Sequence, residues 1–230
     1  MHGWLESRKT WDHVREDLEL DNPLVFYDLR CHGDSGCEEF DMMDLAADLH
    51  SLVKKLGFDS PVLVGRSLGG MTALKYVTMY DEWSGMLLFG TAASTPQPEN
   101  ESVVYFLQRF GHMDREEWSE KIVENYAGGE ADDELKEQSK DLLMEADDRP
   151  VEYGLESMVH YDVRGKLRDF RKPVKVVAGK QDGAIPMEQS EQLAELLEAD
   201  IEEIDTGHLM LERAPEKVAE IIDDFIEENF

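Results

Sequence analysis

Apolar and polar positions alternate along this chain in blocks that predict strands and helices in turn. Short apolar runs are typical of strands buried on both faces of a sheet. They occupy residues 24–28, 62–64, 86–89 and 174–178, with a further short strand at 201–204. Between them, apolar residues recur at helical spacing. The helices that this spacing predicts are residues 10–20, 40–56, 68–79 and 215–228. Such alternation indicates an α/β fold with a mostly parallel sheet.

The alternation stops after Ala93 and resumes at Pro173. A breaker, Thr95-Pro96-Gln97-Pro98, opens a segment that is acidic and helical in pattern up to about residue 166. Its aromatic side chains could line a pocket or could hold helices together. They are Tyr105, Phe106, Phe110, Trp118, Tyr126, Tyr153 and Tyr161. At 230 residues the chain is long enough for one α/β domain with an insertion of this kind.

The run at 62–64 leads directly into Gly65-Arg66-Ser67-Leu68-Gly69. A G-x-S-x-G sequence between a strand and a helix is typical of a nucleophile elbow, in which the serine stands at the tip of a strained turn. The backbone N–H of Leu68 would then lie at a helix N-terminus, where it can stabilise an oxyanion. The pentapeptide also fits a glycine-rich turn of any α/β protein. Residues elsewhere in the chain are needed to distinguish a nucleophile elbow from such a turn.

A serine of this kind needs a base and an acid later in the chain, in the order acid and then histidine. Asp182 follows the strand predicted at 174–178, and His208 follows the strand predicted at 201–204. The strand predicted at 86–89 could have carried the acid instead, but it ends without a carboxylate, and Asp205 is too near His208 in sequence. We therefore expect His208 to take the proton of the serine and Asp182 to orient the imidazole.

The remaining histidines suggest other roles. Four of them lie in helical, charge-rich contexts and are predicted to be solvated or to face the inserted segment; they are His13, His50, His112 and His160. Cys31 and Cys37 are six residues apart in one loop, which predicts free thiols in a reducing, cytoplasmic compartment. Neither a metal-binding pattern nor a membrane-spanning stretch is present in the sequence.

Several stretches, in order along the chain, resemble the α/β-hydrolase superfamily in its branch of small esterases and perhydrolases. They are His2-Gly3-Trp4, the loop at 27–35, Gly65 to Gly70, the turn at 179–182 and Gly207-His208. The resemblance implies an α/β-hydrolase fold with core segments at 1–94 and 167–230 and a helical cap at 95–166. It also implies that the backbone N–H of Trp4 is a second oxyanion donor beside Leu68, and that His32 belongs to a structural turn. A disordered terminus is the alternative for His2-Gly3.

In that superfamily the His-Gly pair ends a strand that lies between the strands expected here at 24–28 and 62–64. This chain begins immediately before His2. Loss of a central strand leaves backbone groups unpaired on both sides. We expect that the gene has an upstream start or that the chain is a fragment, and that the chain alone is poorly soluble or nearly inactive. A small hydrolase in which the flanking strands pair directly is the alternative.

The net charge of the chain restricts which macromolecules it can bind. With 23 basic and 52 acidic residues, the net charge is −29, which excludes a nucleic-acid partner and argues against anionic membranes. The acidic residues are dispersed over predicted helix faces, a pattern typical of proteins from salt-in halophiles, where high salt screens their repulsion. An ordinary acidic cytoplasmic protein is the alternative.

These observations together predict a serine hydrolase that cleaves a small carboxylic ester, thioester or lactone through an acyl-enzyme. Its triad is Ser67, Asp182 and His208, and it needs no metal or organic cofactor. C–C bond hydrolysis or a perhydrolase reaction on the same triad is a second hypothesis, and a non-catalytic binding homologue is a third. A serine nucleophile argues against haloalkane dehalogenase and epoxide hydrolase activity, which need a carboxylate. The sequence names neither the substrate nor the oligomeric state.

Overall fold

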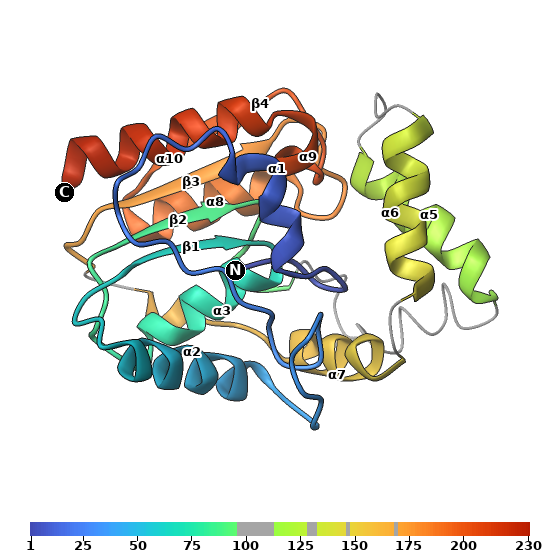
Figure 1. Cartoon of the computed structure of the whole chain (residues 1–230), viewed down its shortest axis with the longest axis horizontal. Coiled ribbons are helices and arrows are strands. Elements are labelled where there is room, and N and C mark those ends of the chain that lie inside the picture. Colours follow the sequence, from blue (N-terminus) through green and yellow to red (C-terminus); the bar gives the residue numbers. More distant parts are fainter. Residues whose placement is uncertain (96–112, 128–132, 146–147, 168–169) are drawn as a thin grey trace.

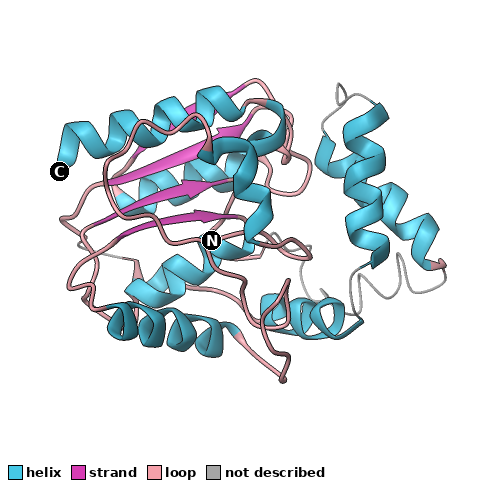
Figure 2. Ribbon diagram, in the orientation of Figure 1, coloured by secondary structure: helices cyan, strands magenta, loops and turns pink. Residues whose placement is uncertain are grey.

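The computed structural model describes residues 1–95, 113–127, 133–145, 148–167 and 170–230 (Figure 1). Within them, a parallel sheet lies at the centre and helices cover both of its faces (Figure 2). The strands stand in the order β1 (Val62–Arg66), β2 (Gly85–Phe89), β3 (Val174–Gly179) and β4 (Asp200–Ile204). All neighbouring pairs are parallel. Their carboxyl ends therefore meet along one edge of the sheet, and the predicted α/β architecture with a parallel sheet is confirmed.

The two faces of the sheet are buried against different helices. Alternate residues of β2 point to opposite faces, so Leu87 and Phe89 join one apolar core while Met86 and Leu88 join the other. The first core contains α1 (Asp12–Arg15), α9 (Met210–Arg213) and α10 (Pro215–Asn229). The second contains α2 (Met42–Leu56), α3 (Leu68–Val77) and α8 (Met187–Leu197). Two-sided burial explains why β2 reads as a continuous apolar run.

Two of the local predictions are wrong. Residues 24–28 form no strand, and in place of a helix over 10–20 the chain forms η1 (Arg8–Trp11) and then α1, which ends at Arg15. The apolar residues Leu24 and Val25 are 42 % and 44 % exposed. An apolar run becomes a strand only where a neighbouring strand receives its backbone hydrogen bonds, and residues 24–28 have no strand beside them in the described part of the chain.

The outer edge of β1 holds a single residue of the N-terminal segment. The α-amino group of Met1 donates to the carbonyl oxygen of Val64 at 2.8 Å, and the backbone N–H of Arg66 donates to the carbonyl oxygen of Met1 at 3.0 Å. Met1 thus stands opposite Gly65 as a parallel strand would. Beyond it, a mainly apolar groove of about 390 Å³ separates β1 from residues 24–27. The two flanking segments do not pair directly.

The described part of the predicted cap is helical. It contains α5 (Arg115–Ala127), α6 (Asp133–Glu145) and α7 (Asp148–Val159), followed by η2 (Arg164–Lys166). Helices α5 and α6 lie beyond the carboxyl ends of the strands (Figure 1). The division into core and cap at 94 and 166 stays a prediction. Tyr105, Phe106, Phe110 and His112 lie outside the described residues.

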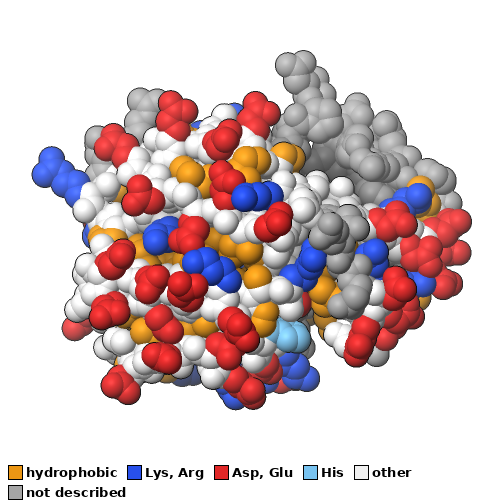
Figure 3. Space-filling model, turned by 90° about the horizontal axis from the view of Figure 1, so that it is seen from above, with side chains coloured by type: hydrophobic (Ala, Val, Ile, Leu, Met, Phe, Trp, Pro, Cys, Tyr) orange, Lys and Arg blue, Asp and Glu red, His pale blue; other side chains and the backbone are white. Residues whose placement is uncertain are grey.

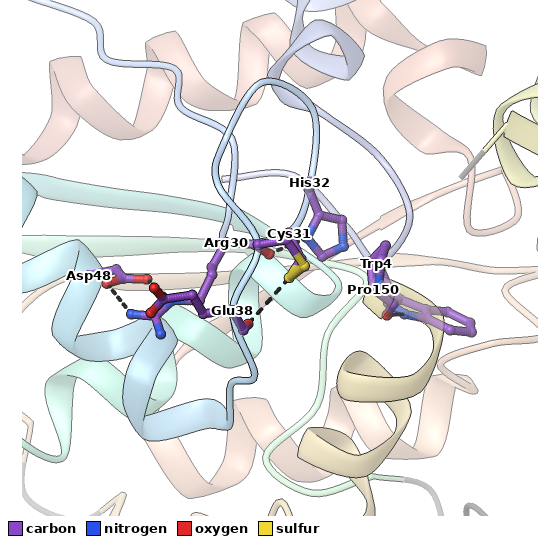
Figure 4. The surroundings of a disulfide bond; sticks show 8 residues. Trp4, Arg30, Cys31, His32, Glu38, Asp48 and Pro150 are labelled. Carbon is purple, nitrogen blue, oxygen red and sulfur yellow. Dashed lines mark hydrogen bonds and ion pairs between the residues drawn. A yellow bond between two sulfur atoms is a disulfide. The ribbon is translucent and has the colours of Figure 1, made fainter. Parts of the chain in front are cut away.

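The prediction of free thiols is wrong, because Cys31 and Cys37 form a disulfide (Figure 4). The loop doubles back on itself, and the backbone N–H of Cys31 donates to the carbonyl oxygen of Gly36 at 3.0 Å. This turn brings the two Cα atoms to 4.0 Å, a proximity that spacing in the sequence does not reveal. None of the helices among the described residues combines the length and apolar character that crossing a membrane requires.

Candidate active site

Ser67 occupies a strained turn between β1 and α3. Its φ of 49° and ψ of −117° are unusual for a residue with a side chain and cost about 1–3 kcal/mol. Two hydrogen bonds hold this conformation: the Ser67 N–H donates to the carbonyl oxygen of Phe89 at 2.9 Å, and the Thr91 hydroxyl donates to the carbonyl oxygen of Ser67 at 2.9 Å. The neighbouring strand therefore fixes the turn that the G-x-S-x-G pattern predicts.

Two glycines make this turn possible. A Cβ atom at Gly65 would lie 2.5 Å from the carbonyl oxygen of Gly69, and a Cβ atom at Gly69 would lie 2.5 Å from the carbonyl oxygen of Met1. These distances are far below van der Waals contact, so any other residue would push the strand, helix and N-terminal segment apart. The elbow and the segment from Met1 are thus in direct backbone contact.

His208 and Asp182 form a buried pair. The Nδ1 atom of His208 lies 2.7 Å from Oδ2 of Asp182, and the two side chains are 2 % and 0 % exposed. The other oxygen of Asp182 accepts hydrogen bonds from the backbone N–H groups of Ala184 and Ile185, each at 2.8 Å. Both carboxylate oxygens therefore have hydrogen-bond partners: one accepts from the loop after β3, and the other faces the imidazole.

The loop that carries His208 is fixed from two sides. Its backbone N–H donates to the carbonyl oxygen of Tyr126 in α5 at 2.7 Å, and its carbonyl oxygen accepts from Nη2 of Arg66 at 2.9 Å. The ring of Tyr126 lies 4.7 Å from the imidazole, and burial raises the pKa of its phenol, so that this ring stays neutral. His208 is thereby tied both to α5 and to Arg66, the residue next to Ser67.

Gly90 brings the end of β2 against this pair. A Cβ atom there would lie 3.2 Å from Oδ2 of Asp182 and 3.3 Å from Nδ1 of His208, and its φ of 49° suits glycine. Gly90 follows Phe89, which accepts the hydrogen bond of the Ser67 N–H. The structure therefore gathers the three predicted triad residues at the carboxyl edge of the sheet, where ligands of open α/β sheets bind.

The predicted oxyanion donors lie at the same edge. Leu68 is the first residue of α3. Trp4 is buried, and its indole Nε1 donates to the carbonyl oxygen of Pro150 in α7 at 2.8 Å (Figure 4). The use of their backbone N–H groups as oxyanion donors stays a prediction. Among the described residues, no group of histidine, cysteine and acidic side chains is arranged to hold a metal ion.

His2 is fully buried, which excludes the alternative of a disordered terminus. Its Nε2 atom accepts from the backbone N–H of Leu29 at 2.9 Å, so its Nδ1 atom donates to the carbonyl oxygen of Gly3 at 2.8 Å. Burial lowers the pKa of His2, in agreement with this neutral tautomer. His32 is also buried, and its Nδ1 atom lies 2.8 Å from the carbonyl oxygen of Arg30 within its turn.

Among the histidines expected to be solvated, His13 and His160 are exposed. His50 is only partly exposed, and its ring stacks on the ring of Tyr80 with 3.9 Å between centroids. Sequence reasoning also missed Arg66 as a buried charge next to Ser67. Its partners lie 60 and 146 residues away, so no local spacing could have indicated them.

Comparisons with known proteins agree with this geometry. A family model described as the alpha/beta hydrolase family matches residues 1–221. The AB hydrolase superfamily protein YisY of Bacillus subtilis is 21% identical over 206 residues, which are 84% of this chain and 76% of that protein. The pimeloyl-[acyl-carrier protein] methyl ester esterase of Vibrio vulnificus is 26% identical over 215 residues, covering 86% of this chain and 81% of the esterase.

Solved structures give the same result. A thermophilic esterase from Thermogutta terrifontis has a TM-score of 0.87 at 25% identity, over 99% of this chain and 88% of the esterase. An esterase from Exiguobacterium antarcticum also has a TM-score of 0.87, at 21% identity, over 99% of this chain and 90% of that one. This chain belongs to the alpha/beta hydrolase family. It is an enzyme of that class.

Proposed function

We propose that the chain is a serine hydrolase that cleaves a small carboxylic ester, thioester or lactone through an acyl-enzyme. The observation that carries this proposal is the buried Asp182–His208 pair, with 2.7 Å between Oδ2 and Nδ1, at the sheet edge that also carries the strained Ser67. Similarity to esterases among both the curated relatives and the solved structures supports ester hydrolysis as the reaction class.

In the first half of the reaction, the Ser67 oxygen attacks the substrate carbonyl carbon while Nε2 of His208 takes the hydroxyl proton. Asp182 accepts the Nδ1–H hydrogen bond and stabilises the imidazolium that forms. The negative charge on the carbonyl oxygen is stabilised by the backbone N–H groups of Leu68 and Trp4. The proton on His208 then passes to the leaving alcohol, thiol or lactone oxygen, and the acyl group stays on Ser67.

In the second half, His208 takes a proton from water, and the resulting hydroxide attacks the acyl carbon. The carbonyl re-forms as the bond to Ser67 breaks, and His208 returns the proton to the serine oxygen. The products are a carboxylic acid and the free enzyme. Every step uses side chains and backbone groups of this chain, and none requires a metal or organic cofactor.

The acidic surface supports a small-molecule substrate and a salt-rich cytoplasm as the setting of the reaction. Acidic side chains are spread over one face of the described residues among fewer basic ones (Figure 3). A net charge of −29 repels nucleic acids and anionic membranes alike. We therefore expect the enzyme to act on a dissolved ester and to work best at high salt.

A panel of p-nitrophenyl esters of increasing acyl length, with γ-lactones added, tests the proposal. We expect turnover to be highest for short acyl chains and to be absent in Ser67→Ala. C–C hydrolysis, a perhydrolase reaction or a non-catalytic binding role would be favoured instead if no ester or lactone in the panel were turned over by the folded wild type.

A further inference from the structure

Arg66 is a buried charge to which the mechanism above assigns no task. It precedes Ser67 at the end of β1, and its side chain is 0 % exposed. A guanidinium can be buried only where charged and polar partners surround it, because its desolvation is otherwise too costly. The partners of Arg66 therefore indicate which role this side chain has beside Ser67.

Those partners belong to two segments that are far from Arg66 in the sequence, one at Glu6 and one that holds both His208 and Glu212. Nη1 forms ion pairs with Glu6 and with Glu212, the latter at 3.3 Å, while Nη2 donates to the carbonyl oxygen of His208 at 2.9 Å. The planar guanidinium has donors on fixed, diverging directions, so one side chain can hold a carboxylate and a carbonyl at once. Arg66 thus ties the His208 loop and the N-terminal segment to the elbow.

Glu6 extends the connection to the predicted oxyanion donor. Its second oxygen, Oε2, accepts from the backbone N–H of Gly3 at 2.8 Å, while the carbonyl oxygen of Gly3 is held by His2 at 2.8 Å. A Cβ atom at Gly3 would lie only 2.8 Å from Oε1 of Glu6, so a larger residue would displace the carboxylate. Both ends of Gly3 are therefore fixed, and the next N–H along the chain is that of Trp4.

We propose that Arg66 and Glu6 are positioning residues, which hold the His208 loop and the Trp4 N–H in register with Ser67. The inference rests on the proposed function, because it assigns these two residues to the same reaction. Neither residue touches the reacting atoms. Their task is to fix the distance between the nucleophile, its base and one oxyanion donor, which are supplied by three separate parts of the chain.

The test uses Glu6→Gln, which keeps the shape of the side chain and removes its charge. The matched control is Glu82→Gln, which removes the same charge from an exposed pair with Lys54 at 2.7 Å. Arg66→Lys is the second variant, since an ammonium cannot span the two directions of the guanidinium. For each, kcat and KM on p-nitrophenyl acetate are measured, together with the rate of fluorophosphonate labelling and the thermal midpoint.

We expect Glu6→Gln and Arg66→Lys to lower kcat by about 10- to 100-fold, because a misplacement of about 1 Å costs rates of this order. KM should stay within about twofold of the wild-type value, and Glu82→Gln should match the wild type in both constants. The proposal is overturned if Glu6→Gln keeps wild-type kcat and labelling rate, or if the losses in both variants vanish once rates are normalised to the folded fraction.

Failure of the proposed function is recognised separately, by a folded wild type that neither labels nor hydrolyses any ester. In that case, hydrogen exchange of the Gly3 amide measured by NMR still tests the contact between Glu6 and the Gly3 N–H. Faster exchange in Glu6→Gln than in Glu82→Gln supports the positioning contact, whereas equal exchange overturns it.

Discussion

The carboxylate of Asp182 reaches Nδ1 of His208 at 2.7 Å while its other oxygen is held by two backbone N–H groups of the loop after β3. The loop therefore fixes the direction of the carboxylate before any substrate binds. A preorganised acceptor at Nδ1 leaves Nε2 free of the proton and able to act as a base.

Asp182→Asn should lower kcat for p-nitrophenyl acetate by about 10³–10⁴-fold. The amide can still accept from Ala184 and Ile185, but it presents an NH₂ group to Nδ1 and so favours the wrong imidazole tautomer. The measurement is kcat together with the thermal midpoint. Asp205→Asn is the matched control, because Asp205 is exposed and accepts a hydrogen bond from Nε2 of Gln181 at 3.2 Å. Equal losses in the two variants would contradict the assignment of Asp182.

The α-amino group of Met1 makes stability depend on pH. Burial lowers its pKa from 8.0 to about 5, so the unfolded chain binds a proton in this interval and the folded chain does not. The free energy of unfolding therefore decreases as pH falls from 8 to 5. A pKa shift of about three units corresponds to a loss of up to about 4 kcal/mol. An otherwise identical chain with an N-terminal acetyl group lacks this penalty. We expect the difference in unfolding free energy between the two chains to grow as pH falls over this interval. A difference that is constant with pH would contradict the prediction.

The groove beside β1 predicts how the chain responds to an N-terminal extension. The carbonyl of Val64 and the N–H of Arg66 already pair with Met1 in parallel register, and the apolar groove continues along the same edge. We expect an extension of alternating Val and Thr residues before Met1 to raise the thermal midpoint and to improve solubility and activity over the chain alone. A Gly/Ser extension of the same length is the control. If both extensions had the same effect, the edge of β1 would not be the cause.

The dispersed carboxylates predict a dependence on salt. The Debye length falls from about 10 Å at 0.1 M to about 3 Å at 1 M, which removes most of the repulsion between surface charges. With 52 acidic against 23 basic residues, the free energy of unfolding and the turnover of p-nitrophenyl acetate should both rise into molar KCl. Stability that is equal or higher in dilute buffer would argue for an ordinary acidic protein.

The sequence predicted β1, β2 and β3 because each contains a short apolar run, and it predicted β4 as the short strand at 201–204, which is only partly buried at the end of the sheet. It also placed Ser67, Asp182 and His208 after these strands, and parallel strands carry such residues to one edge. The prediction failed where structure depends on a neighbour. Residues 24–28 are as apolar as a strand but have no strand beside them among the described residues, and His50 is partly covered by a tyrosine from another segment.

The contacts that the sequence did not indicate are long-range polar ones. The Arg66–Glu6 pair spans 60 residues, and it has no counterpart in periodicity or composition. The Cys31–Cys37 disulfide is short-range, yet it depends on a turn with a positive φ at Cys31 rather than on spacing. Residue spacing predicts individual helices and strands, whereas contacts between them depend on the conformation of the connecting loops.

Fluorophosphonate labelling followed by peptide mass spectrometry tests the central claim most directly. We expect the wild-type chain to carry one adduct, on the peptide that contains Ser67, and we expect Ser67→Ala to carry none while its thermal midpoint stays within a few degrees of the wild-type value. Labelling that persists in Ser67→Ala, or a folded wild type that is not labelled at all, would contradict the assignment of Ser67 as the nucleophile.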